Sequence, residues 1–233
     1  AGGKSETPFV TAKNMVVPNA FVIDGDTAYV SDSAFGGVFS FSVTGAGGTA
    51  DEWVQSDLLK ADKTQCGGLP IDAGANGIAL VNNAFYLTNT TKGTIVKVPR
   101  EANGKAGTPE VYVAQDCANL KGADGLVSDG ANGFYLTANF LNRIIRVAAD
   151  KSLSVAYAGP ELDSPASVAL QGTNLYITNA SFFAAAGTNK PSLLRVTVPA
   201  PLGVRAARAG APGPCRRGRG ARRRGGRPRG LRR

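Results

Sequence analysis

Oxygen-bearing side chains recur at one place in a sequence that repeats itself. An asparagine occupies this place in the first two copies of the repeat, as Asn19 and Asn76, and Asp124 occupies it in the third. The fourth copy has Ala166 there. Amide and carboxylate oxygens suit Ca²⁺ or Mg²⁺ better than zinc. Asn-Gly and Asp-Gly are also common turn dipeptides, so each match alone has a structural explanation, but their recurrence in register predicts a shared metal site.

The repeat itself is a short apolar strand, a tight turn and an aromatic strand that ends in a small polar residue. Its four copies align on the tyrosines Tyr29, Tyr86, Tyr135 and Tyr176. These tyrosines lie 57, 49 and 41 residues apart. Repeats of this kind, built only from short strands, are typical of a β-propeller with one blade per repeat. We expect the tyrosines in the blade cores, and the starts of the inner strands around one axis, where distant residues share a site.

Further strands complete the blades. A third strand is predicted at 38–41, 95–98, 144–147 and 193–196, and a fourth at 52–54, 110–113 and 153–157. Alternation within these runs fits half-buried antiparallel strands. The chain thus divides into an N-terminal extension at 1–16, a propeller at 17–199 with blades at about 17–60, 70–115, 118–160 and 163–198, and a tail at 200–233. We expect residues 180–190 to form a surface loop.

The number of blades is low for a closed propeller, and the last copy lacks an outer strand. Nothing before residue 18 has the pattern of a blade. We therefore expect the chain to be a fragment of a larger propeller. An open row of blades exposes faces and strand edges that favour aggregation or pairing with another chain, so the oligomeric state stays open.

The positive charge of the chain is confined to its C-terminal end. The formal net charge is +9, from 26 Lys+Arg and 17 Asp+Glu, but 203–233 hold 12 arginines and no acid. Without them 14 basic residues face 17 acidic ones, about −3, so the propeller body gives no reason to expect a specific nucleic-acid partner. No apolar run approaches the roughly 20 residues of a membrane span.

The tail at 200–233 consists almost entirely of Arg, Gly, Ala and Pro, and we expect it to be disordered. Two interpretations remain open. It is a basic arm that binds phosphates without reading bases, or it is the product of out-of-frame translation through GC-rich DNA. The exclusive use of arginine as the basic residue favours the second.

The histidine and cysteine content limits the kinds of catalysis and metal binding that are available to the protein. Histidine is absent, which excludes His-based acid–base or metal chemistry. Cys66 and Cys117 precede the inner strands of adjacent blades and are expected on one rim, where a disulfide is feasible. Two separate thiols are the alternative. A bridge would favour the periplasm or the outside of the cell over the cytoplasm.

Two short motifs give the sequence a family resemblance. Asn76-Gly77-Ile78 and Asp124-Gly125-Leu126, with Asn19 one blade earlier, resemble the motifs of the gluconolactonase/regucalcin (senescence marker protein) family of six-bladed, calcium-dependent β-propellers. The stretch 17–198 resembles blades three to six of that family, and 142–147 is also typical of the related NHL-repeat and strictosidine-synthase-like propellers. The resemblance implies a divalent-metal-dependent hydrolase of a lactone or another sugar-derived substrate. It implies Ca²⁺ as the cofactor, with Zn²⁺ and Mg²⁺ as alternatives.

The resemblance also assigns roles to residues. In that family an axial Glu, two Asn and one Asp hold the ion, and Asn19, Asn76 and Asp124 match the last three. The Glu has no counterpart here, since Glu6 lies too close to the next blade. Asp124 would also accept a proton from the attacking water. Three hypotheses remain open: a metal-dependent, lactonase-like hydrolase, an incomplete and inactive piece of such an enzyme, or a non-catalytic propeller that binds a protein or glycan through its rim.

Four further polar residues end the second strands: Asp32, Asn89, Asn139 and Asn179. Strand alternation makes them candidates for turn formation, and the rim position makes them weak candidates for substrate contact.

Overall fold

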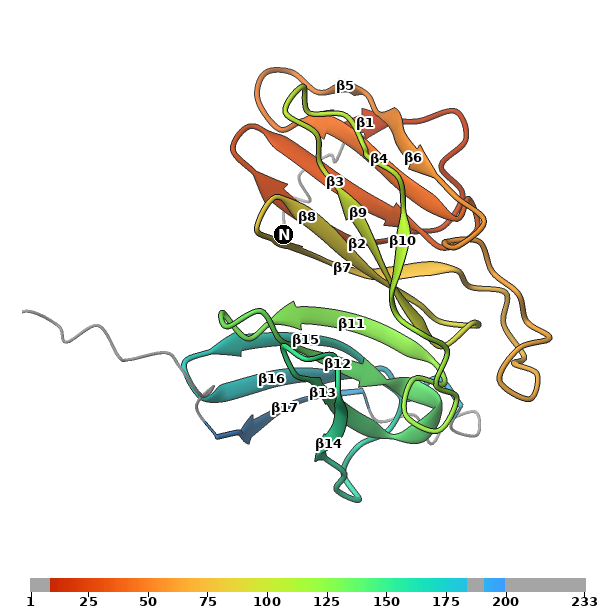
Figure 1. Ribbon diagram of the computed structural model, residues 1–233, viewed down its shortest axis with the longest axis vertical. Helices are drawn as coiled ribbons and strands as arrows, with labels where there is room; N and C mark the ends of the chain where they lie inside the picture. The colour runs from red at the N-terminus through yellow and green to blue at the C-terminus, as the bar shows by residue number, and fades with distance from the viewer. Residues whose placement is uncertain (1–8, 184–190, 200–233) are drawn as a thin grey trace, which may run out of the picture.

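The structure, a computed structural model, describes residues 9–183 and 191–199. Within these ranges the chain forms β-strands and a single short 3₁₀ helix, η1 (Asn139–Leu141). Figure 1 shows the four blade sheets one after another in chain order, the red to yellow-green blades above and the green to blue blades below. The predicted all-β, four-bladed arrangement is confirmed. The predicted tail at 200–233 lies outside the described residues, as does most of the predicted loop at 180–190.

Each blade is an antiparallel sheet whose strands pair in sequence order. The first blade contains β2 (Pro18–Asp24), β3 (Thr27–Asp32), β4 (Gly37–Ser42) and β6 (Asp51–Gln55). The second contains β7 (Ala75–Val81), β8 (Ala84–Asn89), β9 (Thr94–Pro99) and β10 (Glu110–Val113). The third contains β11 (Ala123–Ser128), β12 (Phe134–Ala138), β13 (Arg143–Val147) and β14 (Leu153–Tyr157). The fourth has three strands among the described residues: β15 (Pro165–Gln171), β16 (Asn174–Asn179) and β17 (Ser192–Thr197).

One pairing was not predicted. In the N-terminal extension, β1 (Val10–Thr11) pairs in parallel with β5 (Gly48–Thr49). Beside it, the ring of Phe9 meets that of Phe41 edge-on, with centroids 6.5 Å apart. A two-residue strand is too short to carry an alternating pattern, which is why the sequence gives no sign of it.

The hairpins between first and second strands turn where the sequence predicts. Positive φ angles occur at Gly25 (57°), at Asn82 and Asn83 (49° and 60°), at Gly130 (78°) and at Gly172 (60°). Glycine adopts this conformation without strain and asparagine tolerates it better than most residues. The chain therefore turns directly from each inner strand into the second strand of the same blade.

The repeated tyrosines form apolar contacts between neighbouring blades. The ring centroid of buried Tyr29 lies 4.4 Å from that of Phe85 in the second blade. The ring of Tyr86 lies 4.7 Å from Phe134 in the third. Tyr135 is buried in a core that the third and fourth blades share. Each of the first three blades thus packs its tyrosine against the next blade, whereas Tyr176 of the fourth is partly exposed. The inner strands β2, β7, β11 and β15 lie side by side in that order.

Hydroxyl groups on the second strands fasten each blade to the next. Each hydroxyl belongs to the residue two after the repeat tyrosine, and each acceptor is the backbone carbonyl of the second residue in the following inner strand. The pairs are Ser31 with Asn76, Thr88 with Asp124 (2.6 Å) and Thr137 with Ala166 (3.1 Å). These bonds position the backbones of the candidate site residues relative to one another.

Two glycines allow the inner strands to approach closely. A Cβ atom at Gly77 would lie 2.2 Å from the carbonyl oxygen of Asp124, and one at Gly125 would lie 2.6 Å from the Cα atom of Ser167. Both glycines lie inside strands, in β7 and β11. The turn interpretation of Asn76-Gly77 and Asp124-Gly125 is therefore wrong, because these glycines serve close strand contact instead.

Candidate functional site

The starts of the four inner strands line one cavity of about 780 Å³. Asn19, Asn76, Asp124 and Ala166 all contribute to its wall, and each is the second residue of its strand. The residues that the sequence aligns are therefore also together in space. Asn76 and Asp124 are buried, whereas Asn19 is exposed.

A repeated backbone hydrogen bond sets a partner residue behind each of these four positions. The donors are the backbone N–H groups of Ser33, Thr90, Asn139 and Ala180. Each donates to the carbonyl of the residue just before the inner strand, with N···O distances of 2.9, 3.1, 3.0 and 3.1 Å. The side chains of Ser33, Thr90 and Asn139 then contact the candidate residue of their own blade. Ala180 has no polar side-chain group to do so.

Hydroxyl partners fix the orientation of both asparagine amides. The single proton of Thr90 Oγ1 goes to the carbonyl of Ala123 at 2.8 Å, so this oxygen accepts from Asn76 Nδ2 at 2.9 Å. In the same way Ser33 Oγ donates to Ala75 at 2.8 Å and accepts from Asn19 Nδ2 at 3.2 Å. The Oδ1 atoms of Asn19 and Asn76 are therefore left as acceptors that these hydroxyls do not use.

Asp124 is a buried carboxyl group held by amides. Asn139 Nδ2 donates to its Oδ2 atom at 3.0 Å. Burial disfavours the charged form and raises the pKa of Asp124 from 3.8 to about 7, although hydrogen bonds from Asn139 and Asn76 act in the opposite direction. This carboxyl group therefore changes its charge near neutral pH.

Two amide oxygens beside Asp124 lack partners. Asn76 Oδ1 and Asn139 Oδ1 are buried without a hydrogen-bond partner in the described part of the chain. A Cβ atom at Gly122 would lie 2.3 Å from Asn139 Oδ1, so this glycine makes room for the amide. Buried acceptors without donors are costly unless a ligand or ion satisfies them. Of the two, Asn76 Oδ1 belongs to the predicted ligand set, and an amide oxygen and a carboxylate of this kind suit a hard divalent cation.

The charge content of the site limits that fit. Among residues 9–183 and 191–199, no three acidic or cysteine residues gather to hold a metal. Asp72, an exposed residue just before β7, is the second acid that lines the cavity. An ion here would therefore rest mainly on neutral amide oxygens and one buried carboxylate.

The predicted rim residues divide into two kinds. Asn139 lines the cavity and contacts Asp124. The other three are the buried last residues of β3, β8 and β16 and do not line the cavity. The Asp32 carboxylate, for example, accepts from the backbone N–H groups of Val16, Val17, Ala34 and Phe35. Asn179 donates to the carbonyl of Glu161 at 2.7 Å.

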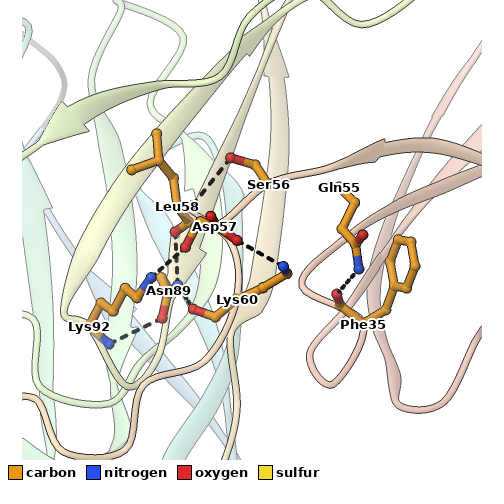
Figure 2. Close-up of polar contacts among 8 residues, drawn as sticks. All are labelled: Phe35, Gln55, Ser56, Asp57, Leu58, Lys60, Asn89 and Lys92. Carbon is orange, nitrogen blue, oxygen red and sulfur yellow. Dashed lines mark hydrogen bonds and ion pairs between the residues drawn. The ribbon is translucent and has the colours of Figure 1, made fainter.

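Figure 2 shows how Asn89 organises a loop of this kind. Its Nδ2 atom donates to the carbonyls of Leu58 and Lys60 at 3.0 and 2.9 Å, and its Oδ1 atom accepts from the N–H of Lys92 at 3.1 Å. Asn89 therefore ties the loop that enters the second blade to the turn between β8 and β9. The hydrogen bonds of Asp32, Asn89 and Asn179 match turn formation rather than substrate contact.

Sequence reasoning did not single out Ser33 and Thr90. Both lie fourteen residues after the candidate asparagine of their blade, and Asn139 lies fifteen after Asp124, in the copy with the longer turn. This constant offset was visible in the aligned repeats and could have identified them. The aromatic residues Phe21, Phe182 and Phe183, which also line the cavity, carry no repeated signal.

A disulfide joins Cys66 and Cys117, with Cα atoms 5.0 Å apart. Of the two alternatives that the sequence left open, the structure has the bridge. It links the loop between β6 and β7 to the loop between β10 and β11. The first of these loops also carries Ile71, Asp72 and Ala73 to the cavity wall.

The fold and the axial cavity define a β-propeller protein. Residues 73–181 match the family model described as SMP-30/Gluconolactonase/LRE-like region. This segment extends from just before β7 to just after β16, and its match confirms the resemblance to that family seen in the sequence. A comparison with curated protein sequences found no match.

Solved structures share the fold at low sequence identity. A protein in a nidogen/laminin complex superposes with a TM-score of 0.56 and 16% identity, over 80% of this chain and 61% of that one. A gluconolactonase from Xanthomonas campestris gives a TM-score of 0.53 and 14% identity, over 78% and 57%. The chain thus spans about three-fifths of these relatives. No helix in the described residues is long and apolar enough to cross a membrane.

Proposed function

We propose that the axial cavity is the active site of a divalent-metal-dependent hydrolase that opens lactones, with Ca²⁺ as the favoured metal. The observation that carries this proposal is the environment of Asp124, a buried carboxyl group beside two amide oxygens that lack partners. The cavity that it lines has room for a small molecule. The family match over 73–181 supports the same activity.

Asn19, Asn76 and Asp124 would hold the ion. When bound, a divalent ion of this kind polarises the carbonyl group of the substrate. The asparagines contribute oxygens without charge, and Ser33 and Thr90 turn those oxygens away from themselves by accepting from the amide nitrogens. The hydroxyl residues therefore act as positioning residues for the ligand set.

Asp124 would accept the proton of the attacking water. The water oxygen forms a bond to the lactone carbonyl carbon, the ring C–O bond breaks, and the product is a hydroxy acid whose new hydroxyl takes up the proton that Asp124 received from the water. Asn139 holds the carboxylate in place by donating to Oδ2. A general base of this kind typically contributes about 10²–10⁴-fold to the rate.

The test is hydrolysis of δ-valerolactone by the full chain, followed with a pH indicator in Ca²⁺, Mg²⁺, Zn²⁺ or chelator. We expect metal-dependent turnover, and a loss of at least about hundredfold in Asp124→Asn. Asp129→Asn is the matched control, because this buried carboxylate lies just after the other end of β11 and binds the N–H groups of Ala131 and Gly133 instead. The folded fraction of Asp129→Asn should hydrolyse the lactone at the wild-type rate. A turnover rate that changes neither with the metal nor in Asp124→Asn would contradict the proposal.

A non-catalytic propeller that binds a partner is the alternative outcome. In that case no lactone is hydrolysed under any metal condition, and Asp124→Asn leaves partner binding unchanged.

A further inference from the structure

The cavity has apolar walls that the proposed chemistry does not use. Phe21 of β2 lies on the lining and is 66% exposed, and Phe182 and Phe183, just after β16, line it with 59% and 51% exposure. Val17 and Ile71 add to these walls. Single exposed apolar residues are ordinary, but several large ones around one cavity indicate a binding surface.

The aromatic wall of the fourth blade is anchored at its base. The backbone N–H of Ser181 donates to the carbonyl of Asp163 at 3.0 Å, and Ser181 Oγ donates to Asp163 Oδ2 at 2.5 Å. Beyond this anchor, the ring of Phe183 lies 4.6 Å from the ring of Phe140. The wall is therefore largely formed before any ligand arrives, which reduces the entropy cost of binding.

Three buried polar residues of the lining, Asn76, Asp124 and Asn139, lie on the second and third blades, and their amide nitrogens already bind Thr90 or the carboxyl group. The other polar residues of the lining are Asn19, Ser33, Asp72 and Ser167, and the amide nitrogen of Asn19 already binds Ser33. The phenyl rings of the end blades offer no hydrogen bonds. A ligand with a hydroxyl group on every carbon would leave several of them against these rings without a partner, which disfavours binding.

We propose that the substrate of this cavity is an amphiphilic lactone, with a ring carbonyl and an apolar substituent in place of ring hydroxyls. The carbonyl lies at Asn76 and Asp124, and the alkyl or aryl substituent lies against Phe21, Phe182 and Phe183. This inference rests on the proposed lactone hydrolysis for the reaction, and on the walls of the cavity for the class of substrate.

The experiment compares two six-membered lactones, δ-decanolactone and δ-gluconolactone, on the full chain in Ca²⁺. We expect a KM at least about tenfold lower for δ-decanolactone, and a rise of about tenfold or more in that KM in Phe21→Ser and Phe182→Ser. Leu193→Ser is the matched control, since this residue is 68% exposed in the same blade as Phe182 but does not line the cavity. It should leave both KM values unchanged.

A second measurement separates this inference from the proposed reaction. Isothermal titration of δ-decanolactone into Asp124→Asn reports binding without turnover. Binding there that weakens when Phe182→Ser is added supports the apolar subsite, even if no lactone is hydrolysed. A lower KM for δ-gluconolactone, or KM values that ignore both phenylalanine substitutions, overturns the inference and leaves hydrolysis standing. Absence of both binding and turnover overturns both.

Discussion

The third and fourth blades present the same backbone with different chemistry. In both, the second residue of the inner strand receives a hydrogen bond from a threonine of the preceding blade, Thr88 to Asp124 and Thr137 to Ala166. In both, the residue after the second strand binds the backbone just before the inner strand. The third blade places Asp124 and Asn139 at these two positions, and the fourth places Ala166 and Ala180.

This difference separates what holds the propeller together from what could react in it. The hydroxyl bonds and apolar cores that join blades do not need a polar side chain at the axial position, because their acceptor is a backbone carbonyl. A blade can therefore lose its axial ligand and keep its place in the row. The buried amide oxygens of the second and third blades have no partner in the described part of this framework, so they are open to water, an ion or a ligand.

The largest stability effect should come from the disulfide, which ties together loops that enter the second and third blades. Its 51-residue separation corresponds to about 4 kcal/mol in the chain-entropy model. Cys66→Ser with Cys117→Ser should lower the free energy of urea unfolding by an amount of this order. Cys215→Ser leaves the pair intact and should have no effect. Equal free energies of unfolding in the wild type and both variants would refute a stabilising role for the disulfide.

The next effect is a pH dependence carried by Asp124. Because its folded-state pKa of about 7 lies above the ordinary value of 3.8, the metal-free folded protein binds this proton more tightly than the unfolded chain does. The stabilisation is fully present below a pH of about 4 and is lost as the pH rises from there through about 7. In chelator, the wild-type free energy of unfolding should fall relative to Asp124→Asn over this range and level off above it, and parallel pH profiles would speak against this.

A smaller effect on stability should distinguish a hydroxyl of the second blade from the equivalent hydroxyl of the fourth. Thr88→Val removes a buried bond to the carbonyl of Asp124 and should cost about 1–3 kcal/mol of unfolding free energy. Thr178→Val changes the equivalent hydroxyl in the fourth blade, which is exposed and accepts from the N–H of Ser167 in its own blade, and the substitution should cost less, about 0.5 kcal/mol. If both substitutions cost the same, the hydroxyls do not act as fasteners between blades.

The strands and the alignment of the site were predictable because both follow from a repeated pattern. Asn76 and Asp124 share a register position, and the propeller fold carries that register to one axis. The loop roles of Asp32, Asn89 and Asn179 were not predictable to the same degree. Their partners are backbone groups of loops, and Asn89 binds Leu58 and Lys60 about thirty residues earlier, so the assignment requires the path of the loop. No local pattern encodes it.

Other residues were predictable only in part. Ser33 and Thr90 were within reach of repeat alignment, since their offset from the asparagines is constant. Gly77 and Gly125 look like turn residues in the sequence, and only the contact of neighbouring inner strands reveals their purpose. The aromatic wall depends on the single segment Ser181-Phe182-Phe183, which has no counterpart in the other blades.

The most direct test of the account is a calorimetric titration of Ca²⁺ into the chelator-treated full chain and into Asp124→Asn, with Ala166→Ser as a control on the same wall. The account predicts one Ca²⁺ per chain in the wild type and in the control, and no measurable binding in Asp124→Asn. The account would be contradicted if the wild-type protein binds none of Ca²⁺, Mg²⁺ and Zn²⁺, or if Asp124→Asn binds the ion equally well. Either result would argue against a metal site at this axis.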